Sequence, residues 1–148
     1  MNAISINNVI EIEINEFPNI SESQLKVQVP SPGAYIFHRG MVFVRRSSRL
    51  KKAKDLYYIF DILANCSELK EQIVNDFKLL KTKYYQWFKR FIKNIKLYFS
   101  DITSDGVALV FSQRQSGIIS DLTDDQFKQY IFNTFKELLN ILENIINN

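Results

Sequence analysis

Residues 78–99, KLLKTKYYQWFKRFIKNIKLYF, restrict the fold most, because their apolar side chains recur at helical spacing. One side of a helix over this stretch would carry Leu80, Tyr84, Trp87, Phe88, Phe91, Ile95 and Tyr98. The remaining surface would carry Lys81, Lys83, Lys89, Arg90, Lys93 and Lys96. An amphipathic helix of this kind buries its apolar side against other elements. The sequence therefore predicts one long helix over residues 78–99, packed within a helical body.

Further helices are expected at 33–44, from Leu50 to Ala64, at 67–77 and from Thr123 onward. Gly40 weakens the first of these, because glycine is a poor helix former. The last begins with TDDQ, a capping box in which Thr123 is the N-cap and Gln126 the third helical residue. The run VALVF at 107–111 predicts a small strand instead.

Two stretches near the N-terminus alternate apolar and polar residues, as half-buried strands do. They are VIEIEINEF at 9–17 and QLKVQVPSP at 24–32, and they predict strands at 8–16 and 24–29. Because a lone two-stranded sheet is marginal in water, we expect helices to pack against it or a third strand to join it. The predicted fold class is α+β: a small antiparallel or mixed sheet followed by a mainly helical bundle, in one domain of residues 1–148.

Positive charge is concentrated in the middle of the chain. Residues 39–96 contain fifteen bases and five acids, a net charge of +10, whereas the whole chain has +3. This asymmetry indicates an anionic partner on one surface, although solvated helix faces are the commoner explanation. A single cysteine and the lack of an apolar run of roughly 18 residues predict a cytoplasmic protein without membrane contact.

The densest cluster of charge, RRSSRLKKAKD at 45–55, suggests a phosphate site. Arg45, Arg46 and Arg49 could bind phosphates bidentately from the loop. Asp55 follows near the start of the next helix, where the helix dipole favours a carboxylate. A solvated helix start would explain the same pattern without any ligand.

Glu11 and Glu13 are a second candidate site, because residues two apart on a strand lie on the same side. Paired carboxylates can hold Mg²⁺, which prefers oxygen ligands. The alternative, which is the more frequent one, is the solvent side of an edge strand. A site built from histidine and cysteine is excluded, since the chain has one of each, far apart in sequence.

The run VQVPSPGAYIFHRGMVFVRRSSRLKKAKDLYYIFDIL resembles the C-terminal half of a nucleotidyltransferase-like domain. It is similar to the bacterial nucleotidyltransferase-fold proteins related to AbiEii-type abortive-infection toxins. The corresponding pieces are Val27-Gln28-Val29-Pro30, Phe37-His38-Arg39 and Lys54-Asp55-Leu56-Tyr57. The resemblance covers residues 24–64 and implies a partial nucleotidyltransferase core in residues 1–64, with residues 65–148 as a helical C-terminal part.

The resemblance also implies roles for individual residues. Arg39 takes the place of the family's phosphate-binding lysine, and Arg45, Arg46, Arg49 and Lys54 would add phosphate contacts. Asp55 matches a carboxylate that supports the active site, and Glu11 or Glu13 would supply a further catalytic, metal-binding carboxylate. The expected ligands are an NTP with Mg²⁺, and the expected acceptor is a protein or an RNA such as tRNA.

The chain departs from the family by lacking its G-S step and its D-x-D strand, which bind the metal ions. We therefore expect an incomplete nucleotidyltransferase that is inactive alone, such as a truncated or degenerate relative. Two alternatives remain open. The chain could be a non-enzymatic module that binds nucleic acid or nucleotide, or a structural domain that pairs with a partner chain or a second copy through its sheet edge.

Overall fold

The computed structural model describes residues 9–13, 26–114 and 121–148. Two strands come first, β1 (Val9–Glu13) and β2 (Lys26–Pro30). Six helices follow: α1 (Pro32–Val42), α2 (Arg49–Asn65), α3 (Lys70–Lys83), α4 (Tyr85–Tyr98), α5 (Asp105–Ser112) and α6 (Asp124–Asn147). Single 3₁₀ turns, η2 (Phe43–Arg45) and η3 (Ser67–Leu69), precede α2 and α3.

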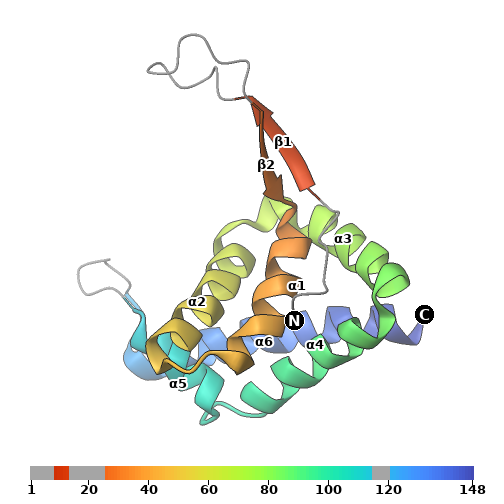
Figure 1. Cartoon of the computed structure of the whole chain (residues 1–148). Coiled ribbons are helices and arrows are strands. Elements are labelled where there is room, and N and C mark those ends of the chain that lie inside the picture. Colours follow the sequence, from red (N-terminus) through yellow and green to blue (C-terminus); the bar gives the residue numbers. More distant parts are fainter. Residues whose placement is uncertain (1–8, 14–25, 115–120) are drawn as a thin grey trace.

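The predicted α+β class is wrong, because the body of the molecule is helical. β1 pairs antiparallel with β2, with Ile10 opposite Val29 and Ile12 opposite Val27. This hairpin projects from the N-terminal end of α1, away from the helices (Figure 1). A sheet covered by helices, which a partial nucleotidyltransferase core requires, is therefore not found in the described part of the chain. Alternation in the sequence indicated extended backbone but could not show whether the strands join the core.

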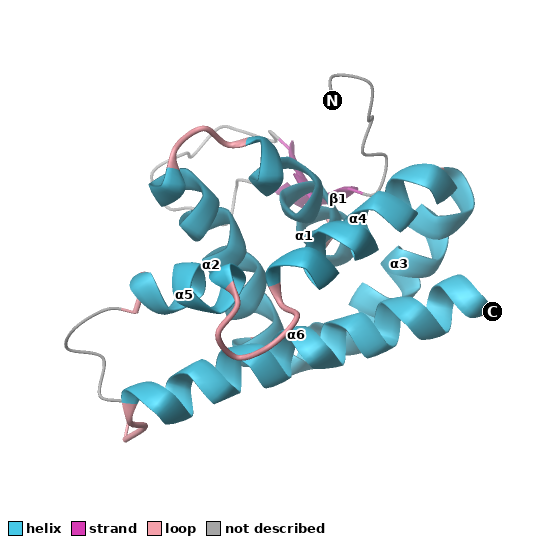
Figure 2. Cartoon of the chain, turned by 90° about the horizontal axis from the view of Figure 1, so that it is seen from below, coloured by secondary structure: helices cyan, strands magenta, loops and turns pink. Residues whose placement is uncertain are grey.

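The helices are arranged around two of their number, α1 and α6. α1 packs against α2, α3 and α4, whereas α6 packs against α2, α3, α4 and α5. α6 runs along the length of the helical body, as Figure 2 shows from below. Segments from both halves of the sequence therefore meet in one core.

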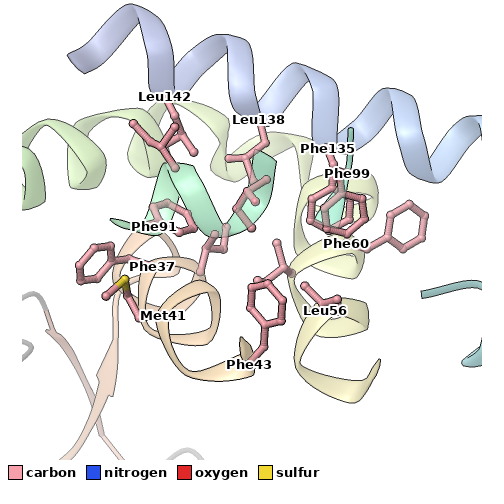
Figure 3. Close-up of a cluster of buried hydrophobic side chains, with 14 of the residues drawn as sticks. Phe37, Met41, Phe43, Leu56, Phe60, Phe91, Phe99, Phe135, Leu138 and Leu142 are labelled. Atoms are coloured by element: carbon pink, nitrogen blue, oxygen red, sulfur yellow. The ribbon is translucent and has the colours of Figure 1, made fainter. Parts of the chain in front are cut away.

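The core between α6 and the α1–α2 pair is rich in aromatic rings (Figure 3). Phe135 on α6 stacks on Phe99, with ring centroids 3.7 Å apart. On the α1 side, Phe37 contacts the rings of Phe88 and Phe91. All five rings are almost fully buried. Each buried ring removes a large apolar area from water and so stabilises the core.

Residues 78–99 form two helices and not the single long helix that was predicted. The break lies at Tyr84, whose φ of −133° and ψ of 54° are not helical. Tyr84 N–H donates to Leu80 as α3 ends, and Phe88 N–H donates to Tyr84 as α4 begins. The change of direction brings Phe88 and Phe91 onto Phe77 of α3. The apolar spacing continues through the break, so the sequence pattern could not reveal it.

The predicted strand at VALVF is also wrong, because these residues lie in α5. Val107, Leu109 and Val110 are buried in the core. A short run of apolar residues fits a buried helix as well as a strand, and packing decides between them. The predicted start of α6 is confirmed: Gln126 N–H donates to Thr123 Oγ1, and Thr123 N–H donates to Gln126 Oε1.

The N-terminus of α1 is fixed by a residue from another helix. Ser31 occupies the N-cap position without a side-chain capping bond, and Pro32 is the first helical residue. Gly33 N–H instead donates to Oδ2 of Asp76, a buried carboxylate on α3, over 2.9 Å. A carboxylate at this end of a helix is favoured by the helix dipole. Asp76 therefore joins α3 to the start of α1.

Candidate functional site

Asp55 lies in the second turn of α2, on the side of the helix that faces the core. Its side chain is only 3% exposed. Its neighbours on that side, Ala53, Leu56, Ile59 and Phe60, are buried hydrophobic residues. A carboxylate removed from water in this way must be paired with a positive charge to remain ionised.

Two arginines provide that pairing. Arg39 Nη1 on α1 donates to Asp55 Oδ1 over 2.6 Å, and Arg46 Nε donates to Asp55 Oδ2 over 2.8 Å. Arg46 follows η2 in the connection between the two helices. The two bonds therefore tie α1, the connection and α2 to one carboxylate. We call this group, Arg39, Arg46 and Asp55, the arginine clamp.

Aromatic rings flank the clamp on its α1 side. The guanidinium carbon of Arg39 lies 5.1 Å from the ring centroid of Tyr35 and 5.7 Å from that of Tyr58. A guanidinium over the face of an aromatic ring is attracted by the ring's quadrupole. Nε of Arg39 is buried and has no hydrogen-bond partner among the described residues. Arg39 is thus held by the rings and one carboxylate oxygen, with 27% of its side chain exposed.

His38 is half-buried beside the clamp. Burial lowers the pKa of its imidazole, and the positive charges of Arg39 and Arg46 act in the same direction, while Asp55 opposes them. The neutral imidazole is therefore favoured next to the two arginines.

The other residues predicted to bind phosphate are placed differently. The two terminal guanidinium nitrogens of Arg49, Nη2 and Nη1, donate to Asp105 on α5 over 2.6 and 3.2 Å, and these bonds lower the pKa of Asp105. Arg45 and Lys54 are exposed. Of the five predicted phosphate ligands, three are thus engaged by carboxylates of this chain, and two face solvent.

Glu11 and Glu13, the predicted metal-binding and catalytic pair, lie on β1 in the projecting hairpin. Asp55 lies on α2 in the helical body, whereas the backbone of β1 lies in the strand pair that projects from it (Figure 1). Among the described residues, no group of three or more His, Cys, Asp or Glu side chains is close enough to hold a metal ion. The expected Mg²⁺ site stays a prediction that this geometry does not support.

The solvent side of α4 is a second concentration of positive charge. Lys89, Arg90, Lys93 and Lys96 are exposed there, and α4 contains no acidic residue. Lys96 Nζ lies 2.7 Å from Glu143 on α6, whereas Lys89, Arg90 and Lys93 have no ion-pair partner within the described part of the chain. We call Lys89, Arg90 and Lys93 the α4 cations. Lys89 Nζ lies 5.6 Å from the ring centroid of Tyr85, which is 45% exposed.

The basic start of α2 adjoins the far end of α4. Lys52 Nζ donates to the hydroxyl of Tyr98, the last residue of α4, over 3.1 Å. The start of α2 and the end of α4, which are distant in the sequence, are therefore in contact. Sequence analysis identified each group but not this contact, because the two residues are far apart in the chain.

The two strands have no third partner strand among the described residues. The expected pairing with another chain through a sheet edge therefore stays a prediction. None of the helices that the structure describes has the length and apolar character needed to cross a membrane.

Comparison with known proteins adds no relative. No protein-family model, no curated protein and no solved structure matches this chain. The resemblance to nucleotidyltransferase-fold proteins is not supported by these comparisons. The function must therefore be argued from the geometry of the arginine clamp and the α4 cations.

Proposed function

We propose that this chain is a non-enzymatic module that binds single-stranded nucleic acid along the solvent side of α4. The observation that carries the proposal is the set of α4 cations, which are exposed and lack ion-pair partners among the described residues. Cations that a protein leaves without carboxylate partners are available to phosphates. Each phosphate contact releases counterions, which favours binding regardless of base sequence.

The spacing of the α4 cations suits a linear polyanion. Lys89 and Lys93 are four residues apart and therefore lie above one another on the same side of the helix. Arg90 lies beside them, and its planar guanidinium group can donate two parallel hydrogen bonds to one phosphate. A phosphate backbone lying along α4 could contact all three residues.

An exposed aromatic ring favours a single strand over a duplex. Tyr85 begins α4 and lies next to Lys89, with almost half of its surface exposed. Unpaired bases stack on such rings, and this stacking tolerates any base sequence. Bases in a duplex are already stacked on one another and have no free face to offer.

The arginine clamp is the reason for preferring binding over nucleotidyl transfer. Metal-assisted phosphoryl transfer uses carboxylates that hold Mg²⁺ against the phosphates. Both oxygens of Asp55 instead accept hydrogen bonds from arginines. We infer that Asp55 serves the fold, and that the arginines it neutralises contribute little to binding.

The test is titration of fluorescein-labelled single-stranded RNA, single-stranded DNA and an RNA duplex with the protein, followed by fluorescence anisotropy. We expect tighter binding of the single strands. With three phosphate contacts, a plot of the logarithm of the association constant against the logarithm of the salt concentration should have a slope of about −2. The double variant Arg90→Glu/Lys93→Glu should bind more than about tenfold more weakly, because two attractive contacts become repulsive.

The matched control is Lys70→Glu/Lys136→Glu, which changes the net charge equally on α3 and α6. It should bind nearly as tightly as the original chain. Equal losses of affinity in the two double variants would mean that binding depends only on net charge. That result would contradict the assignment of the binding surface to α4. Binding of anionic lipid vesicles without binding of oligonucleotides would also reject the proposal.

A further inference from the structure

A groove that contains no residue of α4 is separate from the proposed nucleic-acid surface. It has a volume of about 680 Å³ and lies between the C-terminal end of α2, the start of α3 and the middle of α6. Small-molecule sites in proteins have volumes of about 300 to 1,000 Å³. The groove is therefore large enough to hold a small ligand.

The groove has an apolar floor and a charged rim. Ile62 and Leu63 of α2, Ile73 of α3, and Leu138 and Ile141 of α6 contribute the apolar surface. Lys70 and Lys136 lie at the rim, and both are exposed. Glu137 also lines the groove. Cations thus exceed carboxylates around a hydrophobic depression.

A second hollow of about 460 Å³ continues along α3 and α6. It shares Ile141 with the first groove and is lined by Val74 and Ile145 and by two further lysines, Lys78 and Lys81. Lys81 Nζ donates to the carbonyl oxygen of Ile145, whereas Lys78 is exposed. The two hollows meet at Ile141, lysines line both of them, and we call them together the track.

We propose that this track binds an anionic amphiphile with a single long apolar chain, such as a long-chain carboxylate. The apolar residues that line both hollows would remove the chain from water, which is the main driving force for such binding. A lysine at the rim would pair with the head group through a charge-assisted hydrogen bond. The excess of lysines over carboxylates along the track favours an anionic head group over a cationic one.

The chain contains its own reporter for this site. Cys66 lines the groove, is half-buried and is the only cysteine in the sequence. A ligand in the groove should shield its thiol from a small neutral reagent such as N-ethylmaleimide. The rate of modification therefore reports occupancy of this groove and not binding elsewhere.

The experiment compares dodecanoate with dodecyltrimethylammonium, which has the same chain length and the opposite charge. Both are titrated below their micelle-forming concentrations by calorimetry, and Cys66 modification is measured at each point. We expect saturable binding of one dodecanoate, with slower Cys66 modification, and clearly weaker binding of the cation. Lys70→Glu/Lys136→Glu should weaken dodecanoate binding about tenfold, because the head group loses its charge-assisted contacts.

The matched control is now Arg90→Glu/Lys93→Glu, which should bind dodecanoate as the original chain does. Equal binding of the two amphiphiles would overturn the proposal, since apolar contact alone would then explain it. Dodecanoate binding that leaves Cys66 modification unchanged would place the ligand elsewhere and would also overturn it. Because each double variant is the control for the other surface, failure here is distinguishable from failure of the proposed nucleic-acid function.

Discussion

At the scale of single residues, Asp55 is the charge on which the junction of α1 and α2 depends. Its carboxylate is buried, whereas Arg39 and Arg46 keep 27% and 36% of their side chains exposed. Removing the carboxylate leaves two cations near each other without a counter-charge. Removing one arginine leaves a buried carboxylate with a single partner. The clamp is therefore more sensitive to the loss of its central carboxylate than to the loss of Arg46, its more exposed arginine.

We predict that Asp55→Ala lowers the free energy of unfolding by about 3 kcal/mol, the cost of breaking a buried ion pair from one side. Asp61→Ala on the same helix is the control. Asp61 is exposed, and within the described part of the chain it accepts a bond from Asn65 alone, one turn later, so its loss should cost about 0.5 kcal/mol or less. Urea denaturation measures both. Equal losses of unfolding free energy in the two variants would show that the arginine clamp does not stabilise the junction of α1 and α2.

At the scale of elements, two glycines allow α1 to pack closely against the neighbouring helices α3 and α4. A Cβ atom on Gly40 would lie 2.2 Å from Cε1 of Phe91, and one on Gly33 would lie 2.3 Å from Cβ of Asp76. Asn94 Nδ2 also donates to the carbonyl oxygen of Gly40 over 3.0 Å. The glycine that weakened the helix prediction is thus what allows α4 to approach α1 closely. Helix propensity and tertiary packing oppose each other at this position.

Gly40→Ala decides which of the two effects is larger. The higher helix propensity of alanine would by itself raise the free energy of unfolding by about 1 kcal/mol. Overpacking against the Phe91 ring should instead lower it by about 2 kcal/mol, and we expect the overpacking to prevail. Thermal unfolding measures the change. In the background of Phe91→Leu, where the obstructing ring is absent, Gly40→Ala should cost much less. A higher melting temperature for the single variant would contradict the observed approach of the helices.

At the scale of the whole molecule, local signals predicted the elements better than their packing. The capping box at Thr123 and the apolar spacing of α2 and α6 were sufficient to place those helices. The break at Tyr84 and the helical state of Val107–Phe111 depend on contacts with distant residues, which periodicity does not contain. The same holds for the candidate site: sequence analysis identified Arg39 as a phosphate ligand and Asp55 as an active-site carboxylate, but not the two as partners of each other. The α4 cations were visible as a basic helix side, whereas their lack of carboxylate partners required the structure.

The position of the hairpin leads to the last prediction, which concerns the independence of the helical body. β1 and β2 pair with each other and project away from the helices (Figure 1). A chain that begins at Ser31 should therefore unfold cooperatively, with a free energy of unfolding within about 1 kcal/mol of the original. A chain that begins at Tyr35 is the control, because it also loses the first turn of α1 and the bond from Gly33 to Asp76. Asp76 would then be buried without its partner, and this chain should be less stable by about 2 kcal/mol or more. Circular dichroism and urea denaturation of both chains test the prediction. Loss of cooperative unfolding in the chain that begins at Ser31 would mean that the hairpin belongs to the core, against the arrangement observed.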